Sequence, residues 1–115
     1  MITSLEGKLV GTGLDWADVS IGGITLRAFV PESSVDTLGS LGELVLLYTS
    51  LQVREDSLTL YGFPTNEART TFDALITVNG VGPRLALGIL SMLSPDSLAV
   101  AIAAGDPEAF KGVSG

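Results

Sequence analysis

The chain has neither cysteine nor histidine among its 115 residues. Their absence excludes disulfides, thiolate chemistry, imidazole general bases and most zinc sites, so the sequence favours a binding protein without cofactor or metal over an enzyme. Basic residues are also scarce, because six Lys and Arg stand against 13 Asp and Glu, for a formal net charge of −7. Affinity for DNA depends largely on basic side chains, so any contact with nucleic acid must be local.

Long hydrophobic runs are absent as well. No apolar run approaches the roughly 18 to 20 residues that cross a membrane, and the first ten residues, MITSLEGKLV, lack the basic start and the apolar core of a signal peptide. We therefore expect a cytoplasmic chain with no membrane partner. With 46% hydrophobic residues, the chain has enough apolar side chains for one compact domain or two very small ones.

The first part of the chain carries the alternating apolar pattern of β-strands. Five strands are expected, near residues 2–10, 19–21, 24–30, 44–53 and 58–60. Turn signals separate them at 11–15, at Gly22-Gly23, where a two-residue hairpin fits, and at Glu55-Asp56. Residues 31–40 interrupt the strands with room for one or two helical turns. This pattern suggests a small closed barrel of the oligonucleotide-binding (OB) type, because closure removes exposed strand edges.

After Pro64 the apolar period becomes helical. Thr65 or Asn66 can cap a first helix, and Pro83 fits the first turn of a second. The same cap-then-proline signal recurs before two more helical segments, at Ser94-Pro95 and Asp106-Pro107. The expected fold class is α+β, with a barrel at 1–63 and a small all-α domain at 64–115 that pack directly on each other.

The segment Asn79-Gly80-Val81-Gly82 lies between the first two expected helices, and Arg84 follows it. Val81 would point inward, while the glycines let the backbone approach a ligand. Free N–H groups at the start of the second helix, at the positive end of its dipole, can hold a phosphate oxygen of a nucleic-acid backbone, and Arg84 adds a charge-assisted contact. Such a contact reads no base. The alternative is an ordinary helix end followed by an ordinary proline start, with no ligand.

The last six residues, FKGVSG, repeat the apolar approach that precedes such a hairpin, and Gly115 stands where its first glycine would be. Taken alone, they have the composition of a frayed end. Beside the first hairpin, they look like the start of a second one.

Five stretches carry a family resemblance: MITSLEGKLV, VREDSLTLYGF, EARTTF, NGVGPRLALGILS and FKGVSG. In this order, and over the whole chain, they resemble the RuvA family of bacterial Holliday junction branch migration subunits. The resemblance implies an OB barrel at 1–63 and a helix-hairpin-helix DNA-binding domain at 64–115, truncated at the second hairpin. It also implies a non-catalytic subunit that recognises four-way junction DNA and supports RuvB-driven branch migration in recombination and DNA repair.

The resemblance also implies roles for individual residues. Glu55 and Asp56 correspond to an acidic pin that keeps phosphates away from the junction centre, whereas the residues taken alone favour a solvated hairpin tip. The range Asn79–Gly82, together with Arg84, corresponds to the first hairpin that holds the DNA backbone, and Gly115 to the start of the second. One stretch, GGITLRA, departs from the family pattern, which leaves the packing of the third strand open.

The partners that the resemblance implies are four-way junction DNA, further copies of the chain in a homotetramer or an octamer, a RuvB-type AAA+ ATPase bound through a C-terminal domain absent here, and a RuvC-type resolvase. The alternative is a truncated scaffold fragment that self-associates and binds DNA weakly or not at all. A barrel that binds single strands is disfavoured, because the aromatic residues of the first part lack basic residues between them.

Overall fold

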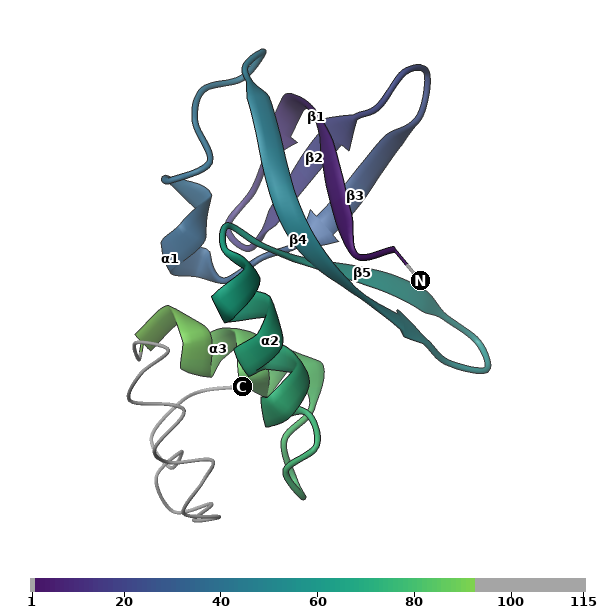
Figure 1. Cartoon of the computed structure of the whole chain (residues 1–115), viewed down its shortest axis with the longest axis vertical. Helices are drawn as coiled ribbons and strands as arrows, with labels where there is room; N and C mark the ends of the chain where they lie inside the picture. The colour runs from purple at the N-terminus through teal and green to yellow at the C-terminus, as the bar shows by residue number, and fades with distance from the viewer. Residues whose placement is uncertain (1, 93–115) are drawn as a thin grey trace.

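The computed structural model describes residues 2–92 and shows a β-barrel with helices packed against one end (Figure 1). In this part of the chain the strands are β1 (Ser4–Thr12), β2 (Trp16–Ser20), β3 (Thr25–Phe29), β4 (Leu44–Val53) and β5 (Leu58–Phe63). The helices are α1 (Glu32–Val35), α2 (Asn66–Leu75) and α3 (Pro83–Met92). The expected α+β class is confirmed.

The strands close into a barrel in the order β1-β2-β3-β5-β4. Neighbouring strands are antiparallel except β3 and β5, which pair in parallel through Phe29 and Tyr61. The short helix α1 lies in the connection from β3 to β4, as the interruption at 31–40 predicted. The closed OB-type barrel is therefore confirmed, and closure gives each strand two pairing neighbours.

Local turn chemistry determines two of the hairpins. Gly22 and Gly23 both have positive φ, and the N–H of Ile21 donates to the carbonyl of Ile24 at 2.7 Å, which makes the expected two-residue turn between β2 and β3. Strand β2 begins at Trp16, earlier in the chain than the start near residue 19 that the apolar pattern predicted. The polar residue Asp18 belongs to this strand because it faces outward and pairs across the ladder with Arg27.

Apolar side chains that alternate along the strands fill the barrel. This first core contains Leu5, Leu9, Ala17, Val19, Ala28, Val30, Leu38, Val45, Leu47 and Leu60. Every second residue of a strand points to one face, so the period of two read from the sequence becomes the inside of the barrel.

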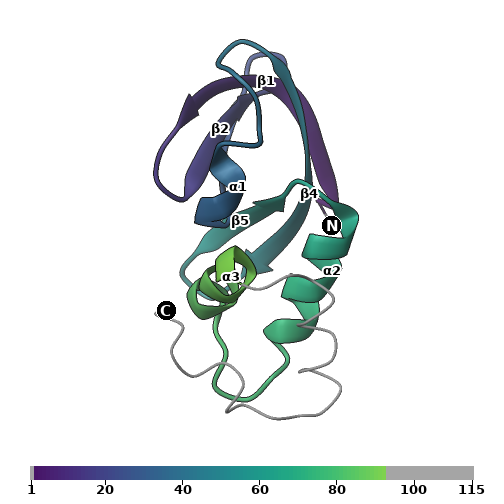
Figure 2. The ribbon, with the colours of Figure 1, turned by 90° about the vertical axis from the view of Figure 1, so that its left-hand side faces the viewer.

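A second apolar core joins the barrel to the helices. It contains Tyr61, Phe63, Phe72, Leu75, Val81, Ala86, Leu87 and Ile89, which come from β5, α2, α3 and the connection between the two helices. The ring of Phe72 is fully buried, with its centroid 4.9 Å from that of Phe63 and 5.1 Å from that of Tyr61. Figure 2 shows α1 and α3 on the same side of the barrel, where they contact each other. Direct packing is confirmed, whereas a domain boundary at 63/64 stays a prediction.

Both long helices begin as the sequence signals predicted. The hydroxyl of Thr65 accepts a hydrogen bond from the N–H of Ala68 at 3.1 Å, so Thr65 is the cap of α2 and Asn66 is its first residue. Pro83 is the first residue of α3. Across residues 2–92, each helix is too short or too polar to cross a membrane. The helices expected after Ser94-Pro95 and Asp106-Pro107, and the hairpin start at Gly115, lie outside the residues that the structure describes.

Candidate nucleic-acid interface

The connection between α2 and α3 forms the hairpin that the Gly-Val-Gly sequence predicts. Val81 is 9% exposed and belongs to the second apolar core, so it points inward. The N–H of Val81 donates to the carbonyl of Val78 at 3.0 Å, which closes the turn. Gly80 has φ of +87°, a left-handed conformation that disfavours any residue with a Cβ.

The outer face of this hairpin is open. Asn79, Gly80 and Gly82 are exposed, and a Cβ built on either glycine would meet nothing within 4 Å. The carbonyl of Gly82 accepts a hydrogen bond from the N–H of Ala86 at 3.0 Å, which places Gly82 at the N-cap of α3. The N–H groups of the first turn that follows, including that of Arg84, have no partner within the helix and are available to an anion.

Arg84 lies beside this open face and meets a carboxylate of the barrel. Its side chain is 76% exposed, and its Nη1 lies 3.8 Å from Oδ2 of Asp15 in the connection from β1 to β2. This ion pair was not anticipated, because nothing in the sequence links two residues so far apart along the chain. Beneath it, burial raises the pKa of the Tyr61 phenol, and the charges of Arg84 and Arg54 offset part of that rise.

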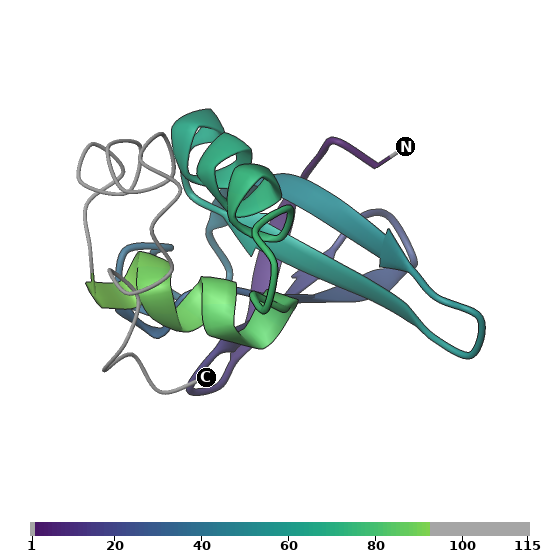
Figure 3. The same ribbon diagram turned by 90° about the horizontal axis from the view of Figure 1, so that it is seen from below.

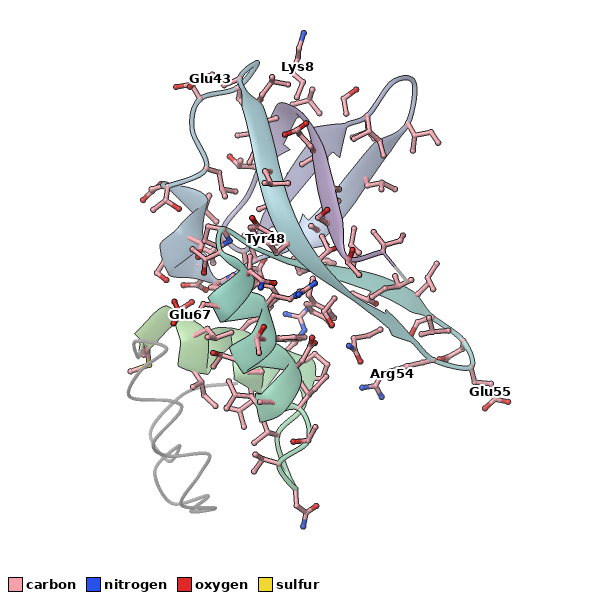
Figure 4. All side chains as sticks on the ribbon, viewed as in Figure 1. Lys8, Glu43, Tyr48, Arg54, Glu55 and Glu67 are labelled. Atoms are coloured by element: carbon pink, nitrogen blue, oxygen red, sulfur yellow. The ribbon has the colours of Figure 1, made fainter. Side chains whose placement is uncertain are left out.

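Glu55 and Asp56 form the tip of the β4–β5 hairpin. The N–H of Arg54 donates to the carbonyl of Ser57 at 2.8 Å, so the two acidic residues make a two-residue turn. Both are exposed, and the hairpin projects well beyond the barrel (Figure 3). Figure 4 shows the Glu55 side chain at the outermost point of this projection, pointing into solvent.

The acidic tip and the glycine hairpin are separate projections of the chain. Figures 1 and 3 show the β4–β5 tip and the α2–α3 connection apart in both views. Within one chain, the structure therefore presents the open glycine hairpin with Arg84 at one place and two negative charges at another. It brings Asn79, Gly80, Gly82 and Arg84 to one surface, with Val81 beneath them.

Four aromatic residues of the barrel, Trp16, Phe29, Tyr61 and Phe63, are poorly placed to stack on bases. Tyr61 and Phe63 are buried in the second core, and Phe29 packs against it. The guanidinium of Arg27 lies 3.8 Å from the centre of the Trp16 ring and is held there by Asp18, through hydrogen bonds of 2.8 and 3.0 Å. These contacts oppose a role as a single-strand stacking platform.

Groups that commonly hold metal ions do not cluster in the described part of the chain. Between residues 2 and 92, Asp and Glu side chains form no group of three or more suited to a metal ion.

Comparison with known proteins gives a consistent family assignment. Residues 1–62 match the family described as RuvA N terminal domain, and residues 72–115 match the SAM-like Helix-hairpin-helix tandem. Proteins named Holliday junction branch migration complex subunit RuvA are similar over most or all of the chain. The chain is 42% identical to that of Dehalococcoides mccartyi (strain CBDB1) over 115 residues, which cover 100% of this chain and 59% of the relative.

Two further relatives agree. Identity is 47% over 106 residues with the subunit of Roseiflexus sp. (strain RS-1), covering 92% of this chain and 54% of the relative. Identity is 44% over 115 residues with the subunit of Symbiobacterium thermophilum, covering 100% of this chain and 56% of the relative. The chain therefore spans little more than half the length of the curated relatives that it matches.

Proposed function

The chain belongs to the RuvA family, and from this premise we propose that it is a non-catalytic DNA-binding subunit that recognises four-way (Holliday) junctions. In this proposal it supports branch migration by a RuvB-type AAA+ ATPase during recombination and DNA repair. The observation that carries the proposal is the open glycine hairpin at the start of α3.

The open backbone of the hairpin suits a DNA phosphate. Its outer face has no side chain at Gly80 or Gly82, so a phosphate oxygen can reach backbone N–H groups directly. The positive end of the α3 dipole and the charge of Arg84 both favour an anion there. Contacts to phosphate fix position without reading sequence, which suits a protein that must bind junctions of any sequence.

The acidic tip supports a preference for the shape of a junction. Glu55 and Asp56 stand exposed on a projecting hairpin, where their charges repel phosphates within about 10 Å at moderate salt. A continuous duplex that lay across this tip would bring two phosphate backbones near it. A four-way junction can open its strands around the tip while its arms bind the glycine hairpins of several copies. Attraction and repulsion then act at different places on one DNA.

Exposed apolar side chains support assembly into a homotetramer around the junction, or into an octamer of two tetramers. Val53 and Leu58 form the last cross-strand pair before the tip, and their side chains are 62% and 69% exposed. Leu44, at the opposite end of β4 from Val53, is 76% exposed. Neighbouring apolar side chains left exposed, such as the pair of Val53 and Leu58, are typical of surfaces that another copy covers. The RuvB-type motor, and a RuvC-type resolvase, complete the proposed set of partners.

The test is competition binding of a four-way junction against a linear duplex of equal length. We expect the junction to bind at least tenfold more tightly. Arg84→Ala should weaken both complexes and reduce the salt dependence by about one unit per bound subunit. Lys8→Ala is the matched control, because Lys8 is exposed at the opposite end of the barrel from the helices (Figure 4). Equal affinity for the two DNAs, or self-association without DNA binding, would overturn the proposal and favour a self-associating scaffold.

A further inference from the structure

We propose that Asp15 competes with DNA phosphate for Arg84 and thereby lowers the affinity of the glycine hairpin for DNA. The inference rests on the proposed role of Arg84 in DNA binding. It assigns Asp15, a barrel residue outside the hairpin, a part in setting that affinity.

The first support is the position of the Asp15 carboxylate. Asp15 lies between β1 and β2, and its carbonyl accepts a hydrogen bond from the N–H of Val30 at 2.9 Å, so its backbone is tied to the barrel. Its Oδ2 lies 3.8 Å from Nη1 of Arg84, and the side chain of Asp15 is only 31% exposed. The carboxylate is thus a partly buried negative charge, on a backbone tied to the barrel, beside Arg84.

The length of the contact shows how this charge acts. Charge-assisted hydrogen bonds between guanidinium and carboxylate measure about 2.7 to 2.9 Å. At 3.8 Å, Asp15 attracts Arg84 through charge without fixing the direction of its N–H groups. The Arg84 side chain is 76% exposed, so a phosphate can approach the guanidinium from solvent. Asp15 therefore does little to orient Arg84, and its main effect is to lower the positive potential that a phosphate meets.

The surroundings strengthen this effect. Asp15 and Arg84 line a cavity of about 260 Å³ together with Glu32 and the apolar side chain of Leu87. A neighbouring cavity of about 250 Å³ is also lined by Asp15, Arg84 and Leu87. Glu32 thus adds a second negative charge to the wall of the cavity that Arg84 lines. A phosphate that binds Arg84 must either displace Asp15 or accept a like charge nearby.

The experiment uses the isosteric change Asp15→Asn, measured against junction and duplex DNA. We expect it to tighten both complexes by about three- to tenfold at low salt, with a smaller gain at higher salt because salt screens the charge. Glu43→Gln is the matched control, since it removes one negative charge at the far end of the barrel (Figure 4) and keeps a carbonyl that can accept the hydrogen bond from Ser40. It should change affinity much less than Asp15→Asn.

A double-mutant cycle shows whether Asp15 acts through Arg84. Asp15→Asn should no longer change DNA affinity when Arg84 is already alanine. The thermal unfolding midpoint of the Asp15→Asn variant should match that of the parent. Unchanged or weaker DNA binding by Asp15→Asn would overturn the inference. So would a gain in DNA affinity from Glu43→Gln, or from Asp15→Asn in the Arg84→Ala background, as large as the gain from Asp15→Asn alone.

The same series separates the inference from the proposed function. If Arg84→Ala weakens DNA binding and Asp15→Asn does not tighten it, only the role of Asp15 fails. If Arg84→Ala leaves DNA affinity unchanged, the phosphate contact fails, and the inference fails with it.

Discussion

Adding one methyl group to either glycine of the α2–α3 hairpin should separate DNA binding from stability. Gly80→Ala and Gly82→Ala each place a Cβ on the outer face, where nothing lies within 4 Å. The two positions differ in backbone conformation, because Gly80 has φ of +87° and Gly82 is not among the residues with positive φ. Neither change creates a clash, so the difference between the two variants comes from the backbone.

The cost to stability follows from these conformations. An L-residue in the left-handed region costs about 1 to 2 kcal/mol, so Gly80→Ala should lower the unfolding midpoint by about 4 °C or more. At Gly82, alanine is a poorer N-cap than glycine by some tenths of a kcal/mol, but it also restricts the unfolded chain, which stabilises by about 0.4 to 1 kcal/mol. These two effects nearly cancel, so Gly82→Ala should change the free energy of unfolding by less than about 0.5 kcal/mol.

The effect on DNA binding should be similar for the two variants. A methyl group at either position stands where a phosphate oxygen must approach to within about 2.9 Å of a backbone N–H. Losing one or two such charge-assisted hydrogen bonds costs about 1.5 to 3 kcal/mol each, which corresponds to at least tenfold weaker binding per subunit. Gly82→Ala should therefore lose DNA affinity while it keeps its stability.

Thermal unfolding followed by circular dichroism and junction binding followed by fluorescence anisotropy, in the same buffer, measure the two effects. Gly80→Asn is a useful third variant, because asparagine tolerates positive φ and should recover part of the unfolding midpoint without recovering DNA affinity. If Gly82→Ala bound junction DNA as tightly as the parent, the outer face of the hairpin would not be where phosphate approaches, and the proposed interface would be wrong.

Two other predictions test the tip and the second core. The double variant Glu55→Gln, Asp56→Asn should raise duplex affinity about tenfold more than junction affinity at low salt. The control Glu43→Gln, Asp36→Asn makes the same chemical changes elsewhere and should not alter this preference. If the tip variant kept the junction preference of the parent, the tip would be an ordinary solvated turn. Phe72→Ala should destabilise the chain by about 3 to 5 kcal/mol in thermal or urea unfolding, because its fully buried ring joins helix and barrel, whereas Leu58→Ala, 69% exposed, should cost far less. An unfolding midpoint of Phe72→Ala equal to that of the parent would refute the role of this ring.

The sequence by itself determined the elements and the turns. Apolar residues two apart along β1 and β4 indicated strands, because successive side chains of a strand face opposite sides. The turns at Gly22-Gly23 and Glu55-Asp56, and the Thr65 cap, were predictable because each involves hydrogen bonds between residues only a few positions apart. The glycine hairpin, with Val81 inside and both glycines open, belongs to the same group of short-range features.

Tertiary structure decided the contacts between residues far apart in the chain. The second core brings Tyr61 and Phe63 of the barrel against Phe72 of α2, and this contact fixes where the hairpin sits on the barrel. The pair of Asp15 and Arg84 exists only because that packing places the start of α3 beside the connection from β1 to β2. Local sequence preferences do not predict such a contact, because the contact depends on strand closure and on how two apolar surfaces fit together. The sequence could therefore indicate a phosphate-binding hairpin, whereas the charge that opposes it became visible only in the fold.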